Sequence, residues 1–360
     1  MKRDVYLNYS SIITGLGSLD ETWEALLNNK SGITQKAHFE NSLLPKTGLS
    51  LYKRDFIDNR ANFTQLLMEE CLSGFPKLPK DTFVIWTGIK NNAETVENLY
   101  KGGKTPHCSS AYDFRSWLAG HLGLTNGGME INAACASSTV GVALATQFIA
   151  EGKYDHILVA GADTVSRFVY YGFAALKAMT EKACMPFDIN RNGLSLGDGA
   201  VALFLSVKRN TDIRVAGYGV TNDANHITGP SRDGAGLAQA MRQAIEMAGL
   251  GTDAVQGFCA HGTGTRYNDT MEILAARSVF GDLQPPMFGL KGAIGHTLGA
   301  AGGIEVALSG KCLAQEIIPP TVGCKSPESP GIVLKKTPFT GKNILTSNSG
   351  FGGVNAAVLM

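Results

Sequence analysis

The chain lacks an excess of charge of either sign. Its 360 residues include 32 basic and 31 acidic side chains, which are interleaved and leave a net charge of +1. Nothing in this balance provides the broad electrostatic field that attracts nucleic acid or a membrane surface. We therefore expect no nucleic-acid partner and no insertion into a membrane.

Paired cysteines are also lacking. The number of cysteines is odd, and neither CxxC nor another paired spacing occurs among them: Cys71, Cys108, Cys135, Cys184, Cys259, Cys312 and Cys324. This usage fits a reducing compartment better than a disulfide framework. The N-terminus has basic residues, but no apolar run or cleavage site follows them. We expect a cytoplasmic protein.

One long uncharged segment is present, at residues 131–150. Its length is about that of a segment that spans a bilayer. Polar side chains are spread around it, however, and Gly141 interrupts its middle. We therefore expect a helix buried on all sides in the centre of an α/β protein, with Cys135 near its N-terminus.

Elsewhere, strand and helix patterns alternate along the chain, which predicts an α/β fold with mostly buried sheets. The hydrophobic content of 44% is enough for one large domain or two fused halves. A polar stretch at residues 208–212 could join two halves, which we place at residues 1–208 and 209–360. We expect strands at residues 155–162, 200–207, 212–220, 255–260 and 354–360, and helices at residues 237–248, 270–280 and 300–314.

Three residues carry the candidate chemistry. A buried cysteine is usually inert, but a helix N-terminus beside Cys135 would favour its thiolate. His261 ends a predicted strand and enters the loop His-Gly-Thr-Gly-Thr, and His296 lies between Gly295 and Gly299. One thiol and two imidazoles beside small residues are what acyl-thioester chemistry needs.

Two rival kinds of site are disfavoured. Neither His261 nor His296 has another histidine or cysteine at a metal-ligand spacing, so we expect no metal. The glycines do not follow the strand–GxGxxG–helix order of a dinucleotide site.

At these residues the chain resembles the elongating β-ketoacyl-acyl-carrier-protein synthases of the thiolase superfamily. The resemblance implies a thiolase-like five-layer αβαβα fold, built of two similar halves with the active site between them, and a dimer as the usual assembly. It runs over nearly the whole sequence, through residues 14–17, 30–33, 134–137, 186–188, 193–200, 260–265, 268–269, 291–305 and 348–355.

The resemblance also implies the reaction. An acyl group would pass from an acyl carrier protein to Cys135, and malonyl carrier protein would lose carbon dioxide. The resulting enolate would attack the acyl-cysteine and give a β-ketoacyl thioester. No separate cofactor is implied, because the phosphopantetheine arm of the carrier is part of the substrate.

The family's residue roles can be carried over to matching positions. The backbone N–H groups of Cys135 and Phe351 would form an oxyanion hole, and Phe351 would also act as a gate. His261 and His296 would donate hydrogen bonds to the malonyl thioester carbonyl. Lys291 and Glu305 would pair with each other and orient this cluster, and Thr263 and Thr265 would bind substrate.

Carrier docking is the least defined part of the resemblance. The family's carrier-contacting basic residue falls near Lys182, and Arg167, Lys177 and Arg191 could enlarge a patch for an acidic carrier. The alternative is that these four scattered cations are solvated surface, but we favour docking. The chain is also shorter than most members, mainly before Cys135 and around residues 180–186.

Several alternatives stay open. A catalytically silent chain-length partner would keep the fold, although the presence of Cys135 argues against it. Initiating synthases pair their cysteine with a histidine and an asparagine, whereas this chain has His296 in place of the asparagine. Thiolases carry a second cysteine in a glycine-rich C-terminal loop, whereas the loop at residues 349–353 has no thiol. Both relatives are therefore disfavoured. The pathway could be housekeeping fatty-acid synthesis or specialised polyene or polyketide assembly. We expect a separate subunit that forms a homodimer or a heterodimer with a related synthase.

Overall fold

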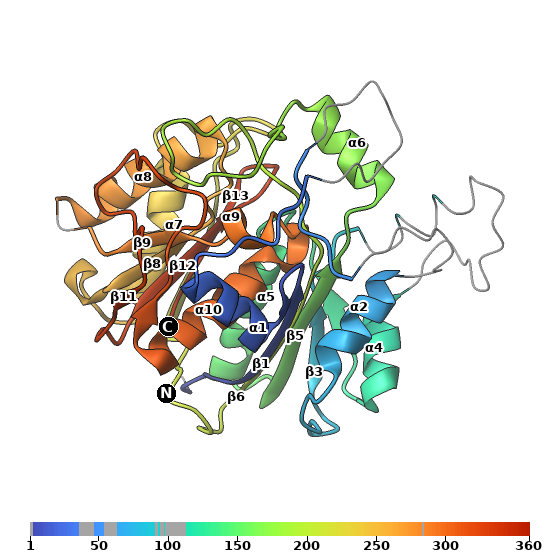
Figure 1. Ribbon diagram of the computed structural model, residues 1–360. Coiled ribbons are helices and arrows are strands. Elements are labelled where there is room, and N and C mark those ends of the chain that lie inside the picture. Colours follow the sequence, from blue (N-terminus) through green and yellow to red (C-terminus); the bar gives the residue numbers. More distant parts are fainter. Residues whose placement is uncertain are drawn as a thin grey trace.

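The computed structural model describes residues 3–35, 47–53, 63–90, 93, 97, 113–282 and 284–360. Two large β-sheets stand side by side, with helices between them and on their outer faces (Figure 1). The first sheet has the order β2-β1-β6-β5-β3-β4. Its strands are β1 (Tyr6–Thr14), β2 (Gly17–Ser18), β3 (Phe83–Trp86), β4 (Gly128–Glu130), β5 (His156–Asp163) and β6 (Gly199–Ser206).

The second large sheet has five strands in the order β7-β13-β12-β8-β9. A short two-stranded sheet joins β10 (Ile317–Ile318) and β11 (Thr337–Pro338). The strands of the five-stranded sheet are β7 (Gly217–Asn222), β8 (Gly257–Ala260), β9 (Met287–Gly289), β12 (Ile344–Ser349) and β13 (Val354–Leu359).

The two large sheets share one topology. In the first, β1 and β5 flank β6 in antiparallel pairing, and β3 and β4 follow β5 in parallel. In the second, β7 and β12 flank β13 in antiparallel pairing, and β8 and β9 follow β12 in parallel. The chain thus builds the same arrangement twice, as the resemblance implied.

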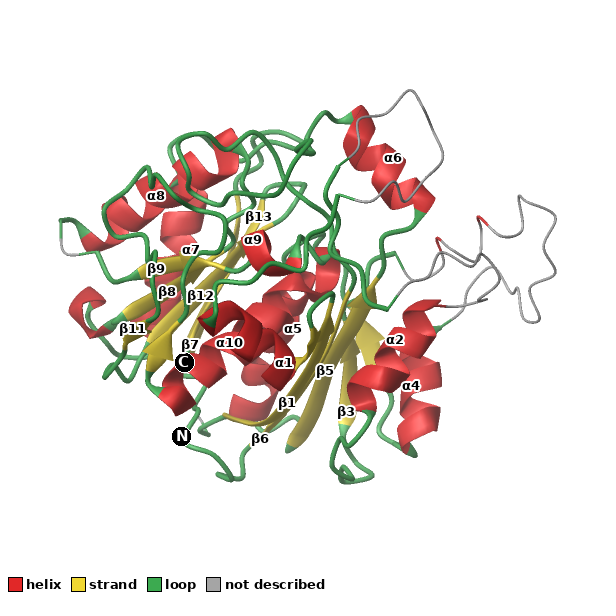
Figure 2. Cartoon of the chain, viewed as in Figure 1, coloured by secondary structure: helices red, strands yellow, loops and turns green. Residues whose placement is uncertain are grey.

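The helices complete five layers (Figure 2). α5 and α10 pack against both sheets and against each other, and α1 joins them in the middle layer. α2 and α4 cover the outer face of the first sheet, while α7 covers that of the second, with α8 packed against it. The helices are α1 (Leu19–Leu27), α2 (Phe63–Leu72), α4 (Phe114–Leu122), α5 (Ser137–Ala150), α6 (Arg167–Ala175), α7 (Ala235–Met247), α8 (Arg266–Phe280), α9 (Lys291–Ile294) and α10 (Ala301–Gln315), with short 3₁₀ turns η1 (Thr252–Ala254) and η2 (Leu298–Ala300).

Sequence patterns explain these positions. Every residue of β6 is buried, as expected of a central strand covered on both faces. Small residues of α5 such as Ser138, Gly141 and Ala145 are buried, so neighbouring layers approach it closely. α7 instead buries one face, with Leu237, Met241 and other apolar side chains packed in the core.

Two predicted elements differ from the structure. The central helix begins at Ser137 rather than at residue 131, because residues 131–136 form a turn with Ala134 in the left-handed region (φ 48°). The strand expected at residues 212–220 is split. Residues 213–215 form backbone hydrogen bonds beside β1, where the Ile213 carbonyl accepts from the Leu7 N–H. The chain then enters the second sheet as β7.

The proposed boundary between residues 208 and 209 lies in this passage between the sheets. The other expected strands and helices are present with ends shifted by a few residues. Within the described ranges, no helix combines the length and the apolar character needed to cross a membrane.

Candidate active site

Three loops meet at the edge where parallel strands of the second sheet end. β8 ends at Ala260 and leads into His261, and the parallel strand β12 ends at Ser349 and leads into Phe351. The turn before α5 adds Cys135. These loops and the segment carrying His296 line one pocket of about 870 Å³. The structure therefore brings together the thiol and both imidazoles that the sequence singled out.

The turn before α5 is held by its own side chains. Ser137 Oγ accepts from the Ala133 N–H at 2.9 Å and donates to the Ala134 carbonyl at 2.6 Å. The loop after β12 presses against this turn. A Cβ at Gly350 would lie 2.6 Å from the Ala133 carbonyl oxygen and 3.3 Å from the Cys135 nitrogen, so only glycine fits there.

Cys135 is buried and lines the pocket. Burial raises the pKa of the thiol to about 11, and the Lys291 ammonium opposes this only in part. The backbone N–H groups of Phe351 and Cys135 also favour the thiolate, as expected for this position, but burial outweighs them and the resting thiol is neutral.

His261 is fixed in one tautomer. Its Nδ1 accepts from Lys291 Nζ at 3.0 Å and from Asn348 Nδ2 at 2.8 Å. Because an ammonium can only donate, the ring proton must be on Nε2. Burial, Lys291 and His296 together hold the pKa of His261 well below its ordinary value, so the ring is neutral.

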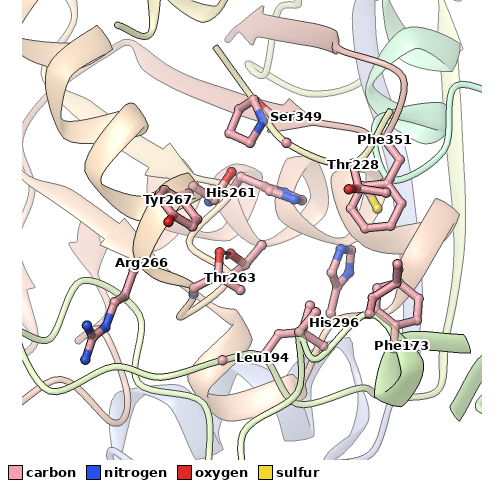
Figure 3. Close-up of a pocket in the computed structure, with 18 of the residues that line it drawn as sticks. Phe173, Leu194, Thr228, His261, Thr263, Arg266, Tyr267, His296, Ser349 and Phe351 are labelled. Carbon is pink, nitrogen blue, oxygen red and sulfur yellow. Dashed lines mark hydrogen bonds between the residues drawn. The ribbon is translucent and has the colours of Figure 1, made fainter. Parts of the chain in front are cut away.

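His296 is arranged in the same way by a different partner. Its Nδ1 accepts from the Leu298 N–H at 3.2 Å, which again leaves the proton on Nε2. Burial, and then Lys291, lower its pKa well below the ordinary value. The two rings are 5.2 Å apart and nearly perpendicular, and both point into the pocket (Figure 3). The pocket therefore holds two neutral N–H donors.

Lys291 and Glu305 form the pair that the resemblance implied. Both are fully buried, with Nζ 2.5 Å from Glu305 Oε1, and Nζ also donates to the His261 carbonyl at 2.5 Å. All three ammonium protons are thus used. Burial raises the pKa of Glu305, although Lys291 and the Asn348 amide favour its ionised form.

Asn348 is a site residue that the sequence did not single out, although it lies in the segment 348–355 that carries the resemblance. Its Nδ2 donates to Glu305 Oε2 at 2.7 Å as well as to His261, and Thr139 Oγ1 donates to its Oδ1. The side chain therefore links α5, α10 and the His261 loop. No strand was predicted at β12, so the available signal was only the position of Asn348 in the segment 348–355 that carries the resemblance.

Buried acids that the sequence reasoning missed support both histidine loops. Glu272 accepts from the N–H groups of His261 at 2.6 Å and Gly262 at 2.7 Å. Asp163 accepts from the Gly299 N–H at 2.9 Å and from Lys90 N–H at 2.7 Å. Burial raises the pKa of Glu272 to about 8 and that of Asp163 to about 7.

The expected gate and substrate-binding residues also lie at the pocket. Thr263 and Thr265 line it, with their hydroxyl oxygens 2.9 Å apart. The Phe351 ring stacks on Phe173 of α6 at 5.8 Å, beside the histidines (Figure 3). Gly352, next in the chain, has a φ of 88°.

The four basic residues proposed for docking are not equivalent. Arg191 is buried and pairs with Glu328 and Asp269, so a docking role for it is wrong. Its guanidinium instead ties the segment before β6 to the start of α8. Lys177 and Lys182 are exposed, and Lys177 lines the pocket. Arg167 begins α6 and is partly buried.

Other expectations can be placed only in part. Much of the shortened region before Cys135 lies outside the described residues, as does Cys108. The other six cysteines carry free thiols. Among the residues that the structure describes, no group of three or more His, Cys, Asp or Glu side chains is arranged to hold a metal ion.

Two family models match the sequence. The model for the β-ketoacyl synthase N-terminal domain matches residues 77–210, and that for the β-ketoacyl synthase C-terminal domain matches residues 213–325. Together they span more than half of the chain. The chain belongs to the β-ketoacyl synthase family.

Curated β-ketoacyl synthases align with much of the chain. A putative polyketide β-ketoacyl synthase 1 of Streptomyces virginiae is 33% identical over 268 residues, which are 69% of this chain and 63% of that protein. The alignment thus spans less than two thirds of that relative. The 3-oxoacyl-[acyl-carrier-protein] synthase 2 of Vibrio cholerae is 27% identical, over 97% of this chain and 98% of that protein. Synthases with these names are condensing enzymes of the acyltransferase type.

Solved ketosynthases have the same fold. A type II polyketide acyl-carrier protein in complex with its ketosynthase, bound to the hexaketide, gives a TM-score of 0.88 at 22% identity, over 100% of this chain and 99% of that chain. The ishigamide ketosynthase/chain length factor gives a TM-score of 0.86 at 25% identity, over 100% of this chain and 99% of that chain. The expected five-layer thiolase-like fold is confirmed.

Proposed function

We propose that this β-ketoacyl synthase catalyses the decarboxylative Claisen condensation of an acyl-cysteine at Cys135 with malonyl carrier protein. One observation carries the proposal. A buried thiol beside two backbone N–H groups shares a pocket with two neutral histidines, and both histidines present Nε2–H.

The first step is acyl transfer. The Cys135 sulfur attacks the carbonyl of an acyl carrier thioester, and the carrier thiol leaves with the proton that Cys135 gives up. The N–H groups of Cys135 and Phe351 stabilise the oxyanion, and the loss of one such donor costs on the order of 3 kcal/mol. A neutral thiol at rest is compatible with this step, because the proton moves during the exchange.

The second step is decarboxylation. The malonyl carboxylate leaves as carbon dioxide, and its bonding electrons move to the thioester carbonyl oxygen as an enolate. His261 and His296 donate Nε2–H to that oxygen. The enolate carbon then attacks the acyl-Cys135 carbonyl, the C–S bond breaks, and the Cys135 sulfur regains a proton. Neutral donors suit this step, because they stabilise charge without surrendering a proton.

The carrier arm enters as part of the substrate, so no separate cofactor is needed. Thr263 and Thr265 line the pocket and offer paired hydroxyls to amide groups of the arm. Carrier protein and a related synthase subunit are the partners we infer. The solved carrier complex and the ketosynthase/chain length factor support both kinds of partner, and Arg167, Lys177 and Lys182 remain the proposed docking cations.

The rival function is that of a silent chain-length partner. The placement of Cys135 among all the groups that its chemistry needs favours an active synthase. The relatives include fatty-acid-type and polyketide-type synthases, and we propose chain elongation without assigning either pathway.

Intact-mass measurement after incubation with a panel of acyl carrier proteins tests the proposal. We expect wild-type protein to gain one acyl group, localised to Cys135 by peptide mass, and Cys135→Ala to gain none. Cys312→Ala, which removes a buried thiol remote from the pocket, is the matched control and should still acylate. If the wild type retains no acyl group from any carrier, the silent-partner function is the better one.

A further inference from the structure

The turn that follows His296 has a backbone conformation that its sequence disfavours. Leu298 has a φ of 53°, in the left-handed region that residues other than glycine rarely adopt. Its N–H donates to His296 Nδ1, and in the part of the chain that the structure describes it is the one donor to that atom. The tautomer of His296 therefore depends on the geometry of this turn, whereas two buried side chains fix that of His261.

Gly299, the next residue, is clamped through both of its backbone groups. Its N–H donates to Asp163 Oδ2 at 2.9 Å, and its carbonyl accepts from Ser138 Oγ at 2.6 Å. A Cβ at this position would lie 2.5 Å from the Thr87 carbonyl oxygen, so the turn lies directly against the end of β3. The turn is thus held from the first sheet by the last residue of β5 and from the middle layer by α5.

The Asp163 carboxylate is itself fixed by a second loop. Its Oδ1 accepts from the N–H groups of Ile89 at 3.0 Å and Lys90 at 2.7 Å, and Oδ2 faces Gly299. The side chain is completely buried. Burying a carboxylate costs free energy unless several donors surround it, and here the donors come from two separate loops. The carboxylate therefore joins the turn after His296 to the segment after β3.

Loss of the clamp would change what His296 offers to the pocket. Without its anchors, Leu298 could return to an ordinary backbone conformation and withdraw its N–H from His296 Nδ1. With no donor to hold it, the ring could carry its proton on either nitrogen. The pocket would then lose part of one of its two Nε2–H donors.

We propose that Asp163 and Ser138 are positioning residues for decarboxylation, acting on His296 through the turn that they clamp. Neither side chain forms a hydrogen bond with the ring, and their effect is to keep the ring proton on Nε2. The inference rests on the proposed function, since that function gives His296 its task of donating to the malonyl thioester carbonyl.

The tautomer can be measured without any reaction, by long-range proton–nitrogen NMR of protein with isotope-labelled histidines. The His296 signals are assigned from their loss in His296→Gln. At a pH well above the pKa of Asp163, which burial raises to about 7, we expect wild-type protein to show a protonated Nε2. Asp163→Asn should show both tautomers, because its oxygen can stay with the two donors after β3 while its nitrogen cannot accept from Gly299. Ser138→Ala removes the other half of the clamp and should do the same.

Asp188→Asn is the matched control for the loss of a buried carboxylate. Asp188 also accepts from three backbone N–H groups, those of Asn190, Lys325 and Ser326, and it does not line the pocket. This variant should lower the melting temperature, as Asp163→Asn does, but leave the His296 tautomer unchanged. The inference fails if both clamp variants keep the wild-type tautomer, or if the control changes it as much as they do.

A kinetic split separates positioning from damage to the fold. We expect Asp163→Asn to release carbon dioxide from malonyl carrier protein with a kcat about tenfold lower, a smaller loss than for removal of a whole oxyanion donor, and with an unchanged KM. Acylation of Cys135 should not slow, because burial and then the Asp163 charge raise the pKa of that thiol, and the variant removes the charge. Equal losses in both steps would contradict a positioning role. A wild-type protein that shows the predicted tautomer but never releases carbon dioxide would support the clamp and reject the proposed function.

Discussion

At the scale of single residues, the groups behind the histidines set what the histidines can do. Lys291 and Asn348 both donate to His261 Nδ1, so Nε2 must carry the proton that faces the pocket. Glu305 holds both donors in place. The network converts an imidazole, which could accept or donate, into a fixed neutral donor.

Asn348→Asp tests this network. A carboxylate at residue 348 cannot donate to His261 Nδ1 and would compete with the ring for the Lys291 ammonium. Nδ1 could then carry the ring proton and donate to the carboxylate, so Nε2 would be lost as the donor to the thioester carbonyl. We expect carbon dioxide release from malonyl carrier protein to fall about 100-fold, as for loss of an oxyanion donor. Asn348→Ala leaves Lys291 in place and should lose less. Equal rates for the two variants would show that the tautomer does not matter.

The pKa of Cys135 gives a prediction with a definite sign. Below a pKa of about 11 the thiolate fraction rises about tenfold per pH unit. The rate of Cys135 alkylation by iodoacetamide, followed by peptide mass, should therefore rise steadily from pH 7 to about pH 10. A plateau near neutral pH would mean that the thiol is already ionised, contrary to the burial seen here.

What the sequence could predict at this scale depends on local context. Cys135, His261 and His296 stood out because small residues flank each of them. Arg191 did not reveal its role, since a buried arginine and a docking arginine look alike until Glu328 and Asp269 are placed beside it. Glu272 and Asp163 were missed because their partners are backbone N–H groups of the histidine loops, which no residue pattern marks.

At the scale of elements, the site depends on how closely two loops approach. The loop after β12 carries Phe351, and its Gly350 lies directly against the turn before α5, which carries Cys135. The sequence predicted the helix but neither β12 nor this contact. The left-handed Ala134 and the start of α5 at Ser137 belong to a turn that Ser137 closes locally and that the loop with Gly350 packs against, which helical periodicity alone does not reveal.

Gly350→Ala should damage the oxyanion hole without unfolding the protein. The added methyl would meet the Ala133 carbonyl oxygen, and the loop would have to move with the Phe351 N–H. We expect acylation of Cys135 to slow about 100-fold, measured by intact mass over time. Gly120→Ala in α4, where a Cβ meets nothing within 4 Å, is the control and should acylate normally. Normal acylation by Gly350→Ala would remove Phe351 from the oxyanion hole.

At the scale of the whole molecule, the repeated topology explains why one site has parts from both halves. α5 follows β4 and α10 follows β9, and these strands occupy equivalent positions in the two sheets. Cys135 precedes α5, and His296 precedes η2 and α10. The nucleophile and a histidine are thus presented from corresponding places. Alternation of strands and helices predicted the layers, but only the resemblance predicted that the halves would face each other.

Cys135→Gln tests the central claim most directly, by measuring carbon dioxide and β-ketoacyl product together. The glutamine amide can occupy the oxyanion hole and resemble an acylated cysteine, while His261 and His296 remain intact. We predict carbon dioxide release from malonyl carrier protein without any β-ketoacyl product. Formation of β-ketoacyl product by this variant, or release of carbon dioxide no faster than without enzyme, would contradict the account.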